Sequence, residues 1–422
     1  MKPDLPRGLY RAVFFLAPCI GLIGLTLEVP ALSVLAGGML GLIMLAALYV
    51  IVVGGRLSLG RRCADGACQD DSVPVTLAAV NRGFLPVHLL EVGDEFEPAL
   101  NPAVRLVVPS MLWPGYQHAF EYSGHCFRRR GIYHVGPLSL QVRDPMGFFV
   151  RREAVADIRQ FDVFPNIVPL PTVQFPKGRP GASCATQSYP RAGASLAYLG
   201  TREYRPGDEV RDIHWPATAR LGRPVVKERE VDLPPMVTLV LDLDERHFEG
   251  VGQRSTVEFQ VTVAASLALE ATRQRGAFQV IADDLHLPVG AGPMQLEAFM
   301  HKLVTLKPDS NRAIGDVLRE AARHVPPDSL VVPFIAGLEL HPGLLSAGVQ
   351  ACVAQGCAVR CVVFDDSTFL RRKRRVPAPG DTRLSVETIV RWLNAAGAEA
   401  CVMGAEDDPS ARILEIFEGI FR

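Results

Sequence analysis

Two long apolar runs lie near the start of the chain, from Ala12 to Leu27 and from Ala31 to Val53, and neither contains a charged side chain. The second run would rise about 34 Å as a helix, which exceeds the roughly 30 Å of a bilayer core. The first run is shorter and contains Pro18, so it spans only if flanking residues share the interface. Because only Glu28-Val29-Pro30 separates the runs, the pattern predicts a transmembrane helical hairpin within residues 1–62.

Basic residues flank this pair of runs, and none lies between them. Positively charged flanks stay on the cytoplasmic side, so the N-terminus and all later domains are predicted to lie in the cytoplasm, with the hairpin in a bacterial inner membrane. The competing interpretation is a cleaved signal peptide followed by a stop-transfer segment, but no convincing small-x-small cleavage site separates the runs. The flanking residues are Lys2, Arg7 and Arg11 before the pair and Arg56, Arg61 and Arg62 after it.

Short alternating runs dominate the next part of the chain, as in Val73–Leu77 and Leu138–Val142. A period of two indicates strands with one buried face. Turn residues such as Gly136-Pro137 separate the runs, so residues 70–165 are predicted to form a small antiparallel β-sandwich. Residues 166–199 are rich in proline, glycine and other small residues, and they are predicted to be an extended connector.

Apolar strand-like runs alternate with helical runs in the C-terminal half. Ser255 and Glu258 have the spacing of a capping box before an apolar helix, and Gly276 is predicted to stop that helix. The alternation predicts parallel strands with crossover helices on both faces, an open doubly wound α/β sheet within residues 200–422. The fold class is thus α+β multidomain. The predicted strands are Met236–Leu241, Phe278–Ile281, Leu330–Ile335, Ala358–Phe364 and Ala400–Met403.

Charge and cysteine content narrow the function classes. The chain has 44 basic and 45 acidic residues, so no global field attracts nucleic acid, which is not an expected partner. Nine cysteines without a disulfide-like spacing agree with a reducing compartment. One dense basic run could dock on the anionic lipid headgroups of the nearby membrane, although a solvated loop is the simpler interpretation. That run is Arg371, Arg372, Lys373, Arg374 and Arg375.

The most specific motif is the stretch from Gly200 to Arg220, GTREYRPGDEVRDIHWPATAR. It resembles the signature of the DUF58 family, bacterial membrane proteins whose C-terminal domain resembles a von Willebrand factor A fold. The segments Arg130–Pro137 and Asp144–Phe149 also match that family's β-rich part. The resemblance covers nearly the whole chain, but Pro216 and Thr218 stand where the family usually has lysine and serine.

The signature has four arginines and four acids with aromatic residues between them, which favours an internal network of ion pairs. A ligand pocket and a protein-docking surface are the functional alternatives. Pro206-Gly207 fits a type II turn, and His214 is predicted to be a structural histidine rather than a base. The candidate signature residues are Arg202, Glu203, Tyr204, Arg205, Gly207, Asp208, Arg211, Asp212, His214, Trp215 and Arg220.

The resemblance also bears on metal binding. A von Willebrand A domain that binds Mg²⁺ uses Asp-x-Ser-x-Ser after its first strand, whereas this chain has Asp242, Asp244 and Arg246 at those positions. The arginine opposes cation binding, so no cofactor is expected, and Asp242 is predicted to cap backbone amides or to pair with Arg246. The alternative is a Mg²⁺-dependent ligand-binding or hydrolytic domain centred on Asp242 and Asp244, with Glu339 or His214 assisting.

Other catalytic motifs are absent: there is no phosphate-binding Gly-rich loop ending in Lys-Ser or Lys-Thr, no His-Glu-x-x-His and no Gly-x-Ser-x-Gly. No catalytic residue is therefore assigned. The expectation is a non-catalytic, membrane-anchored interaction scaffold. The family resemblance implies a MoxR-type AAA+ ATPase as its partner, in envelope or protein-complex maturation.

Overall fold

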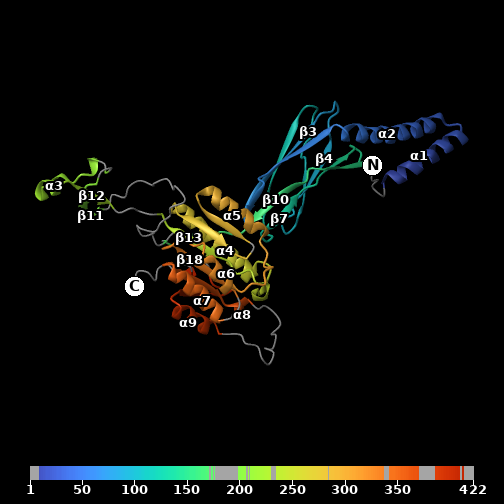
Figure 1. The fold of residues 1–422 in the computed structure, drawn as a ribbon. Helices are drawn as coiled ribbons and strands as arrows, with labels where there is room; N and C mark the ends of the chain where they lie inside the picture. Colours follow the sequence, from blue (N-terminus) through green and yellow to red (C-terminus); the bar gives the residue numbers. More distant parts are fainter. Residues whose placement is uncertain are drawn as a thin grey trace, which may run out of the picture. The chain divides into compact units, whose positions relative to one another are not determined.

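The chain forms two compact units, Met1–Asn166 and Ile167–Arg422 (Figure 1). The predicted connector lies mostly outside the described part of the chain, and Gly207, Glu339 and the basic run 371–375 lie wholly outside it. This computed structural model describes residues 9–170, 173, 175, 198–205, 208, 210–229, 234–283, 285–336, 342–369, 385–408 and 411–412.

The first unit begins with two apolar helices, α1 (Leu9–Thr26) and α2 (Pro30–Gly54), which lie side by side (Figure 1). Glycine allows their close approach, because a Cβ added at Gly24 would lie 2.8 Å from the Leu32 Cβ. Within the described side chains, α2 alone is long and apolar enough to cross a membrane, and Phe15–Thr26 is a shorter apolar helix. The structure thus supports one of the two predicted spans directly.

A β-sandwich follows the helices directly. Its strand β1 begins at Leu57, inside the stretch that the sequence analysis gave to the hairpin and its flank, and the β10–β2 pairing is parallel rather than antiparallel. The three sheets contain β1 (Leu57–Arg62), β3 (Ser72–Asn81) and β6 (Gln117–His125); β5 (Ala103–Val107), β4 (Leu89–Glu95), β8 (Leu138–Arg143) and β9 (Val150–Val155); and β2 (Gly66–Cys68), β10 (Arg159–Phe164) and β7 (Gly131–Val135).

Alternate side chains of these strands form the sandwich core, as the period of two requires. Val75 and Leu77 of β3 are fully buried, and Val92 of β4 packs in the same cluster. The rings of Phe96 and Phe161 meet edge to face with centroids 5.3 Å apart. The core therefore joins residues from all three sheets.

Arg61 of β1 is a charged exception in this core. Its side chain is fully buried, and Nη1 donates to Asp94 Oδ1 at 2.7 Å. Nη2 donates to the carbonyl oxygens of Val135 and Asp157, at 2.9 and 2.6 Å. The Tyr122 hydroxyl donates to the other Asp94 oxygen at 2.8 Å. Burial, reinforced by this carboxylate, raises the pKa of Tyr122. Arg61 thus neutralises a buried acid as well as contributing to the basic flank.

The second unit contains one six-stranded sheet of order β17-β16-β13-β18-β19-β20. In chain order this is 3-2-1-4-5-6, the doubly wound order that the alternation predicts. All neighbours are parallel except the edge strand β17, which is antiparallel to β16. The strands are β13 (Met236–Val240), β16 (Ala277–Ile281), β17 (His286–Ala291), β18 (Leu330–Ile335), β19 (Ala358–Phe364) and β20 (Glu399–Met403).

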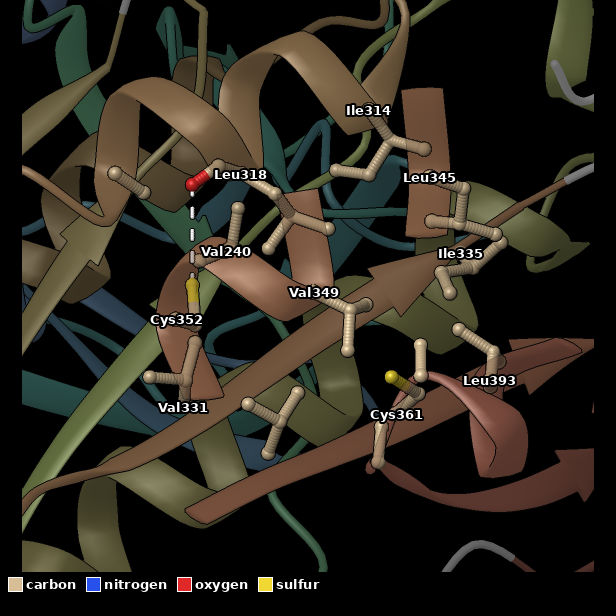
Figure 2. Close-up of a cluster of buried hydrophobic side chains, with 14 of the residues drawn as sticks. Val240, Ile314, Leu318, Val331, Ile335, Leu345, Val349, Cys352, Cys361 and Leu393 are labelled. Carbon is tan, nitrogen blue, oxygen red and sulfur yellow. Dashed lines mark hydrogen bonds between the residues drawn. The ribbon is translucent and has the colours of Figure 1, made fainter. Parts of the chain in front are cut away.

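Helices cover both faces of this sheet. On one face, the helix residues Leu318, Leu345 and Val349 point toward the strand residues Val331 and Ile335 (Figure 2). The side chains of both groups are almost completely buried. The opposite face packs Phe278 of β16 against Phe299, with centroids 5.8 Å apart. The helices are α4 (Thr256–Arg273) and α5 (Pro293–Thr305) on this second face, α6 (Ile314–Ala321), α7 (Pro342–Ala354) and α9 (Val386–Ala395) on the first, and the short α8 (Asp366–Phe369) after β19.

The predicted cap of α4 is confirmed, because the Ser255 hydroxyl accepts the hydrogen bond of the Glu258 backbone N–H. The predicted stop needs a correction. Arg275, not Gly276, adopts the left-handed conformation, with φ at 55°. Gly276 is required for space instead, since a Cβ there would lie 2.7 Å from the Pro235 carbonyl oxygen. Before α4, the short strands β14 (Gly250–Val251) and β15 (Arg254–Ser255) form a tight hairpin.

Candidate functional site

The signature folds as a small module of its own, defined here as the signature module. Strand β11 (Tyr198–Glu203) pairs antiparallel with β12 (Val225–Arg229). Between them lie a 3₁₀ helix, η1 (Val210–Asp212), and the helix α3 (Trp215–Leu221). Gly222 ends α3 in the left-handed conformation at φ 67°, which glycine adopts without strain. The motif is therefore a hairpin whose connection carries the helix.

Ion pairs inside the module use part of its charge. Both guanidinium nitrogens of Arg202 donate to Asp208, at 2.8 and 2.7 Å, in the bidentate geometry expected of arginine and carboxylate. The Arg205 backbone N–H also donates to Asp208. These bonds lower the pKa of Asp208 to about 2, and the bond from the Arg202 side chain has the largest effect. Glu203 pairs with Arg223, which lies outside the predicted signature. The predicted internal network is present at these pairs.

His214 caps the helix α3. Its Nδ1 accepts a hydrogen bond from the Ala217 backbone N–H at 3.1 Å, and Pro216 occupies the first turn, where its missing N–H costs nothing. The Thr218 hydroxyl accepts from the Val225 backbone N–H at 3.1 Å and so ties the helix to β12. The histidine, proline and threonine of the motif therefore have structural roles in this fold. A serine hydroxyl could make the same bond as Thr218.

The module also presents a large exposed surface. Trp215 is 63% exposed and Leu221 56% exposed, at the two ends of α3, and Val210 of η1 is 65% exposed. Arg220, next to Leu221, is exposed as well. Tryptophan and arginine are the residue types most enriched at energetically important positions of protein interfaces. The module thus has the composition of a docking surface on a frame held by its own ion pairs.

A second group of polar residues lies at the carboxyl end of β13, where the strand order reverses between β16 and β18. Open α/β sheets bind ligands at such positions. Asp242 is fully buried there: its Oδ1 accepts from the Asp244 backbone N–H at 3.1 Å, and its Oδ2 from that of Ala336 at 3.3 Å. Oδ2 also lies 3.1 Å from His247 Nδ1. Four residues, Asp242, Asp244, Arg246 and His247, are called the Asp242 cluster below.

Arg246 pairs with Asp244 and not with Asp242, which corrects one of the two roles predicted for Asp242. The Arg246 Nε donates to Asp244 Oδ1 at 2.8 Å, and the backbone N–H of Arg246 donates to the same oxygen at 3.1 Å. Asp244 thereby caps the 3₁₀ helix η2 (Glu245–His247). The other predicted role, capping of backbone amides by Asp242, is confirmed.

Proton affinity in the cluster is set by burial and by these pairings. Burial raises the pKa of Asp242, although His247 and the two amides act against it. Burial by itself would lower the pKa of His247. The hydrogen bond with Asp242 and the negative charges of Asp242 and Asp244 have a larger effect, so the pKa of His247 is raised. For Asp244, the bonds from Arg246 outweigh the raising effect of burial, so its pKa is lowered. Asp242 and His247 thus both bind a proton more readily than in water, and Asp244 binds one less readily.

The donors around these carboxylates bear on metal binding. Among the described residues, no group of three or more histidine, cysteine, aspartate or glutamate side chains is arranged to hold a metal ion. Asp244 already faces the Arg246 guanidinium, and Asp242 faces an imidazole and two amides. These groups occupy the positions that a divalent cation would have to take over. Glu339, the third proposed ligand, lies outside the described residues.

Sequence reasoning missed the neighbours of this cluster. Ser310 pairs with the cluster's backbone, and its hydroxyl donates to Asp283 at 2.6 Å. Arg312 joins Asp283 to Glu320, at 2.7 Å from each. Nothing in the local pattern around Asp283 shows that the loop with Ser310 and Arg312 returns to it. His247 was missed for the same kind of reason.

A hollow lies further along the same sheet edge, at the carboxyl ends of β19 and β20. Two of its acids are engaged locally: Asp365 accepts from the Ser367 N–H at 3.2 Å, and Asp407 accepts from the Gly404 N–H at 2.7 Å. Asp407 also pairs with Arg412 at 3.4 Å. These contacts shape the loops rather than present an unoccupied charge.

Comparison with known proteins bears out the family resemblance. A family model described as "Protein of unknown function DUF58" matches residues 200–335, which include the signature module and the Asp242 cluster. The match places residues 200–335 in the DUF58 family. No curated protein matches the chain.

Solved structures give only distant likenesses. The CARDB domain of the PF1109 protein from Pyrococcus furiosus is 16% identical, with a TM-score of 0.19, over 25% of this chain and 84% of that domain. A β-glucosidase from Listeria innocua is 11% identical, with a TM-score of 0.16, over 25% of this chain and 16% of the enzyme. Similarities this weak carry no argument about function.

Proposed function

We propose that this protein is a membrane-anchored, non-catalytic interaction protein whose signature module docks a protein partner. The observation that carries the proposal is the exposure of Trp215 and Leu221 beside Arg220, on a module whose Arg202–Asp208 pair is satisfied internally. Exposure of a large aromatic side chain to water is unfavourable in free energy, and its burial against a partner removes that unfavourable term. Membrane anchoring is supported by α2.

The non-catalytic part of the proposal rests on the Asp242 cluster. At the ligand edge of the doubly wound sheet, Asp242 binds His247 and Asp244 binds Arg246, so neither of these two carboxylates is left to act as a base or a metal ligand. The strand order and the place of Asp242 after the first parallel strand support a von Willebrand A-like domain without its cation.

The proposed partner is a MoxR-type AAA+ ATPase, in envelope or protein-complex maturation, and the proposed location is the bacterial inner membrane with both hairpin helices spanning. Family resemblance is the basis for the partner. The location is supported by the apolar hairpin and by the basic residues on both of its flanks. An ATPase that works in the cytoplasm could then reach the signature module.

The test is recovery of the partner with the tagged full chain, crosslinked in native membranes and identified by mass spectrometry. We expect an AAA+ ATPase with the wild type and loss of that ATPase with Trp215→Ala. Met294→Ala is the matched control, because Met294 is also an exposed apolar residue of the second unit, at 84%, but lies outside the signature module. Equal recovery with both variants would move the docking surface elsewhere, and no ATPase with the wild type would refute the proposed partner.

The alternative function is a Mg²⁺-dependent ligand-binding or hydrolytic domain centred on Asp242 and Asp244. The burial of both carboxylates at the ligand edge of the sheet is its best support. Calorimetry of the purified chain with Mg²⁺ and with Mn²⁺ separates the two functions. We expect no saturable heat, and saturable binding that Asp242→Asn abolishes would favour the alternative.

A further inference from the structure

Three loops of the β-sandwich surround the C-terminal part of α2. They connect β3 to β4 (residues 82–88), β5 to β6 (108–116) and β8 to β9 (144–149), and together they are called the loop cluster. Hydrogen bonds join the first two loops and link the first loop to the helix, and the third loop packs on the helix through Phe148 and Phe149. Val87 and Leu112 exchange backbone bonds of 2.9 Å, and the Tyr49 hydroxyl of α2 donates to the Pro86 carbonyl at 2.7 Å. The loop cluster and the helix end therefore form one surface.

This surface exposes large apolar and aromatic side chains. Phe84 is 69%, Trp113 57% and Tyr116 68% exposed, and Met111 and Met146 are exposed as well. The three loops contain no lysine or glutamate; their charged residues are Arg82, which is exposed, and Asp144, which is buried. Tryptophan and tyrosine are the residues that gather where a membrane protein meets lipid headgroups.

The contacts of α2 place these loops at membrane depth. Phe148 and Phe149 pack against Ile43, Ala46 and Val50 of the helix, so the sandwich covers one side of α2 from Gly54 back to Ile43. That covered part rises about 17 Å, which leaves about 20 Å for the part before it, against a bilayer core of roughly 30 Å. If α2 crosses a membrane, part of its covered stretch must lie within the apolar layer, and the loop cluster must reach that layer too.

The backbone of the 144–149 loop suits the apolar layer, where no water is present to form hydrogen bonds with polar groups. Asp144 accepts from the N–H groups of Met146 and Phe149 through its side chain, at 2.9 and 2.6 Å. Its carbonyl accepts from the Gly147 N–H at 3.0 Å. Beside it, Arg151 of β9 donates to the Ile51 carbonyl at 3.1 Å, one of the four carbonyls that a helix end leaves unpaired.

We propose that the loop cluster is a membrane-docking surface, with Phe84, Met111, Trp113, Tyr116 and Met146 inserted into the interfacial layer of a phospholipid bilayer around α2. The surface continues from a candidate transmembrane helix, carries aromatic residues, and adds the exposed Arg56 and Arg82 where anionic headgroups lie. The inference rests on the membrane anchoring proposed above. It makes the sandwich part of the anchor rather than a domain on a tether.

The test uses the full chain in phospholipid vesicles and tryptophan as a depth probe. Trp215 and Trp392 are replaced by phenylalanine so that Trp113 alone fluoresces. We expect its emission to shift to shorter wavelength on reconstitution and to be quenched by lipids spin-labelled near the headgroup. Two comparison chains carry Trp113→Phe with one new tryptophan each: Leu100→Trp, in the exposed loop between β4 and β5 at the opposite end of the sandwich, and Leu40→Trp, on α2.

The comparison chains separate the two ideas. Quenching at Trp113 and at position 40 but not at position 100 supports the docking surface. Quenching at position 40 alone overturns it and leaves the α2 anchor intact. No quenching at any position refutes the anchor, and the docking surface with it.

A second measurement needs no substitution. Hydroxyl radicals oxidise exposed methionine readily, and mass spectrometry locates the product. In the unaltered chain in vesicles, we expect Met111 and Met146 to be protected relative to the detergent-dissolved chain, with Met294 of the second unit equally oxidised in both. Oxidation of Met111 and Met146 that is unchanged by the bilayer would overturn the proposal.

Discussion

Arg61 shows how much one residue can do that a charge pattern does not reveal. Its guanidinium binds Asp94 and two backbone carbonyls inside the sandwich, while Arg62, the next residue, is exposed. In the sequence both are members of a basic flank. Strand periodicity distinguishes them, because neighbouring residues of β1 point to opposite faces of the sheet.

Arg61→Ala should therefore destabilise the first unit strongly. It leaves Asp94 buried without its cation, a change that costs about 3–5 kcal/mol in comparable pairs. Arg62→Ala is the matched control and should change stability by at most about 0.5 kcal/mol. Urea unfolding of the detergent-dissolved chain, followed by Trp113 fluorescence, measures both. Similar midpoints for the two variants would show that the buried pair contributes little.

The Asp242–His247 pair gives a prediction about pH. The folded-state pKa of His247 lies above its unfolded value of about 6.5, and that of Asp242 is raised too. Stability from the histidine is thus fully present below pH about 6.5 and is lost as the pH rises through the raised folded value. The raised pKa of Asp242 acts in the same direction, since its buried carboxyl group loses its proton at a cost as the pH rises.

His247→Gln removes the titrating group but keeps a hydrogen-bond donor. We expect the stability advantage of the wild type over this variant to be larger near pH 6 than near pH 8.5. Urea unfolding followed by Trp392, on α9, reports on the second unit when Trp113 and Trp215 are phenylalanine. A difference that does not vary with pH would contradict the pairing.

Among the elements, buried parallel strands were the easiest to predict. The bounds of β18 and β19 agree with the apolar runs, because a strand buried on both faces is mostly apolar. Arg360 of β19 is an exception, and its Nε donates to Glu399 at 2.9 Å. The edge strand β17 was missed, since Pro288 interrupts its sequence and only an edge position tolerates such a residue. The strand β1 was missed because its last residues are arginines.

The hairpin gives the prediction at the level of elements. A Cβ added at Gly21 would lie 3.2 Å from the Ala36 Cβ, a little less than the roughly 3.5–4.5 Å of a disulfide, so with a small shift of the helices Gly21→Cys and Ala36→Cys should crosslink in a Cys19→Ala background. Adding Gly24→Ile should reduce the crosslink, because overpacking of this kind costs about 1–3 kcal/mol. Mass spectrometry of the linked peptides quantifies the yield.

The control for this substitution is Gly38→Ile, also in the hairpin, where an added Cβ meets nothing within 4 Å. It should leave the crosslink unchanged. If both isoleucine variants crosslink as well as the parent, α1 and α2 do not depend on close contact at Gly24.

At the scale of the whole molecule, the sequence predicted which kinds of structure occur and in what order, but not which side chains meet. The signature was recognised from its residues, yet the roles of His214 as a cap and of Thr218 as a tie to β12 depend on a hairpin that the motif does not spell out. The Asp242 cluster depends on contacts with Ala336, which lies ninety-four residues further along the chain. Such contacts follow from the sheet order.

The predicted topology can be tested in cells with two fusions. A reporter active only in the cytoplasm should work after Arg62, and a reporter active only after export should work after Val29. Export activity after Arg62 would reverse the orientation. Cytoplasmic activity after Val29 would show that α1 does not cross, which would leave α2 to anchor the protein alone.

Arg246 places a fixed positive charge beside Asp244 at the ligand edge of the sheet. A domain that recruits its cation from solution depends on the concentration of that cation, and a chelator can detach its partner. Here the positive charge next to Asp244 is part of the chain and cannot be removed. We therefore expect EDTA to change neither the melting temperature of the second unit nor the recovery of the proposed partner. A decrease of either on chelation would reveal a bound metal ion. No change in either would agree with Arg246 as the counter-ion of Asp244.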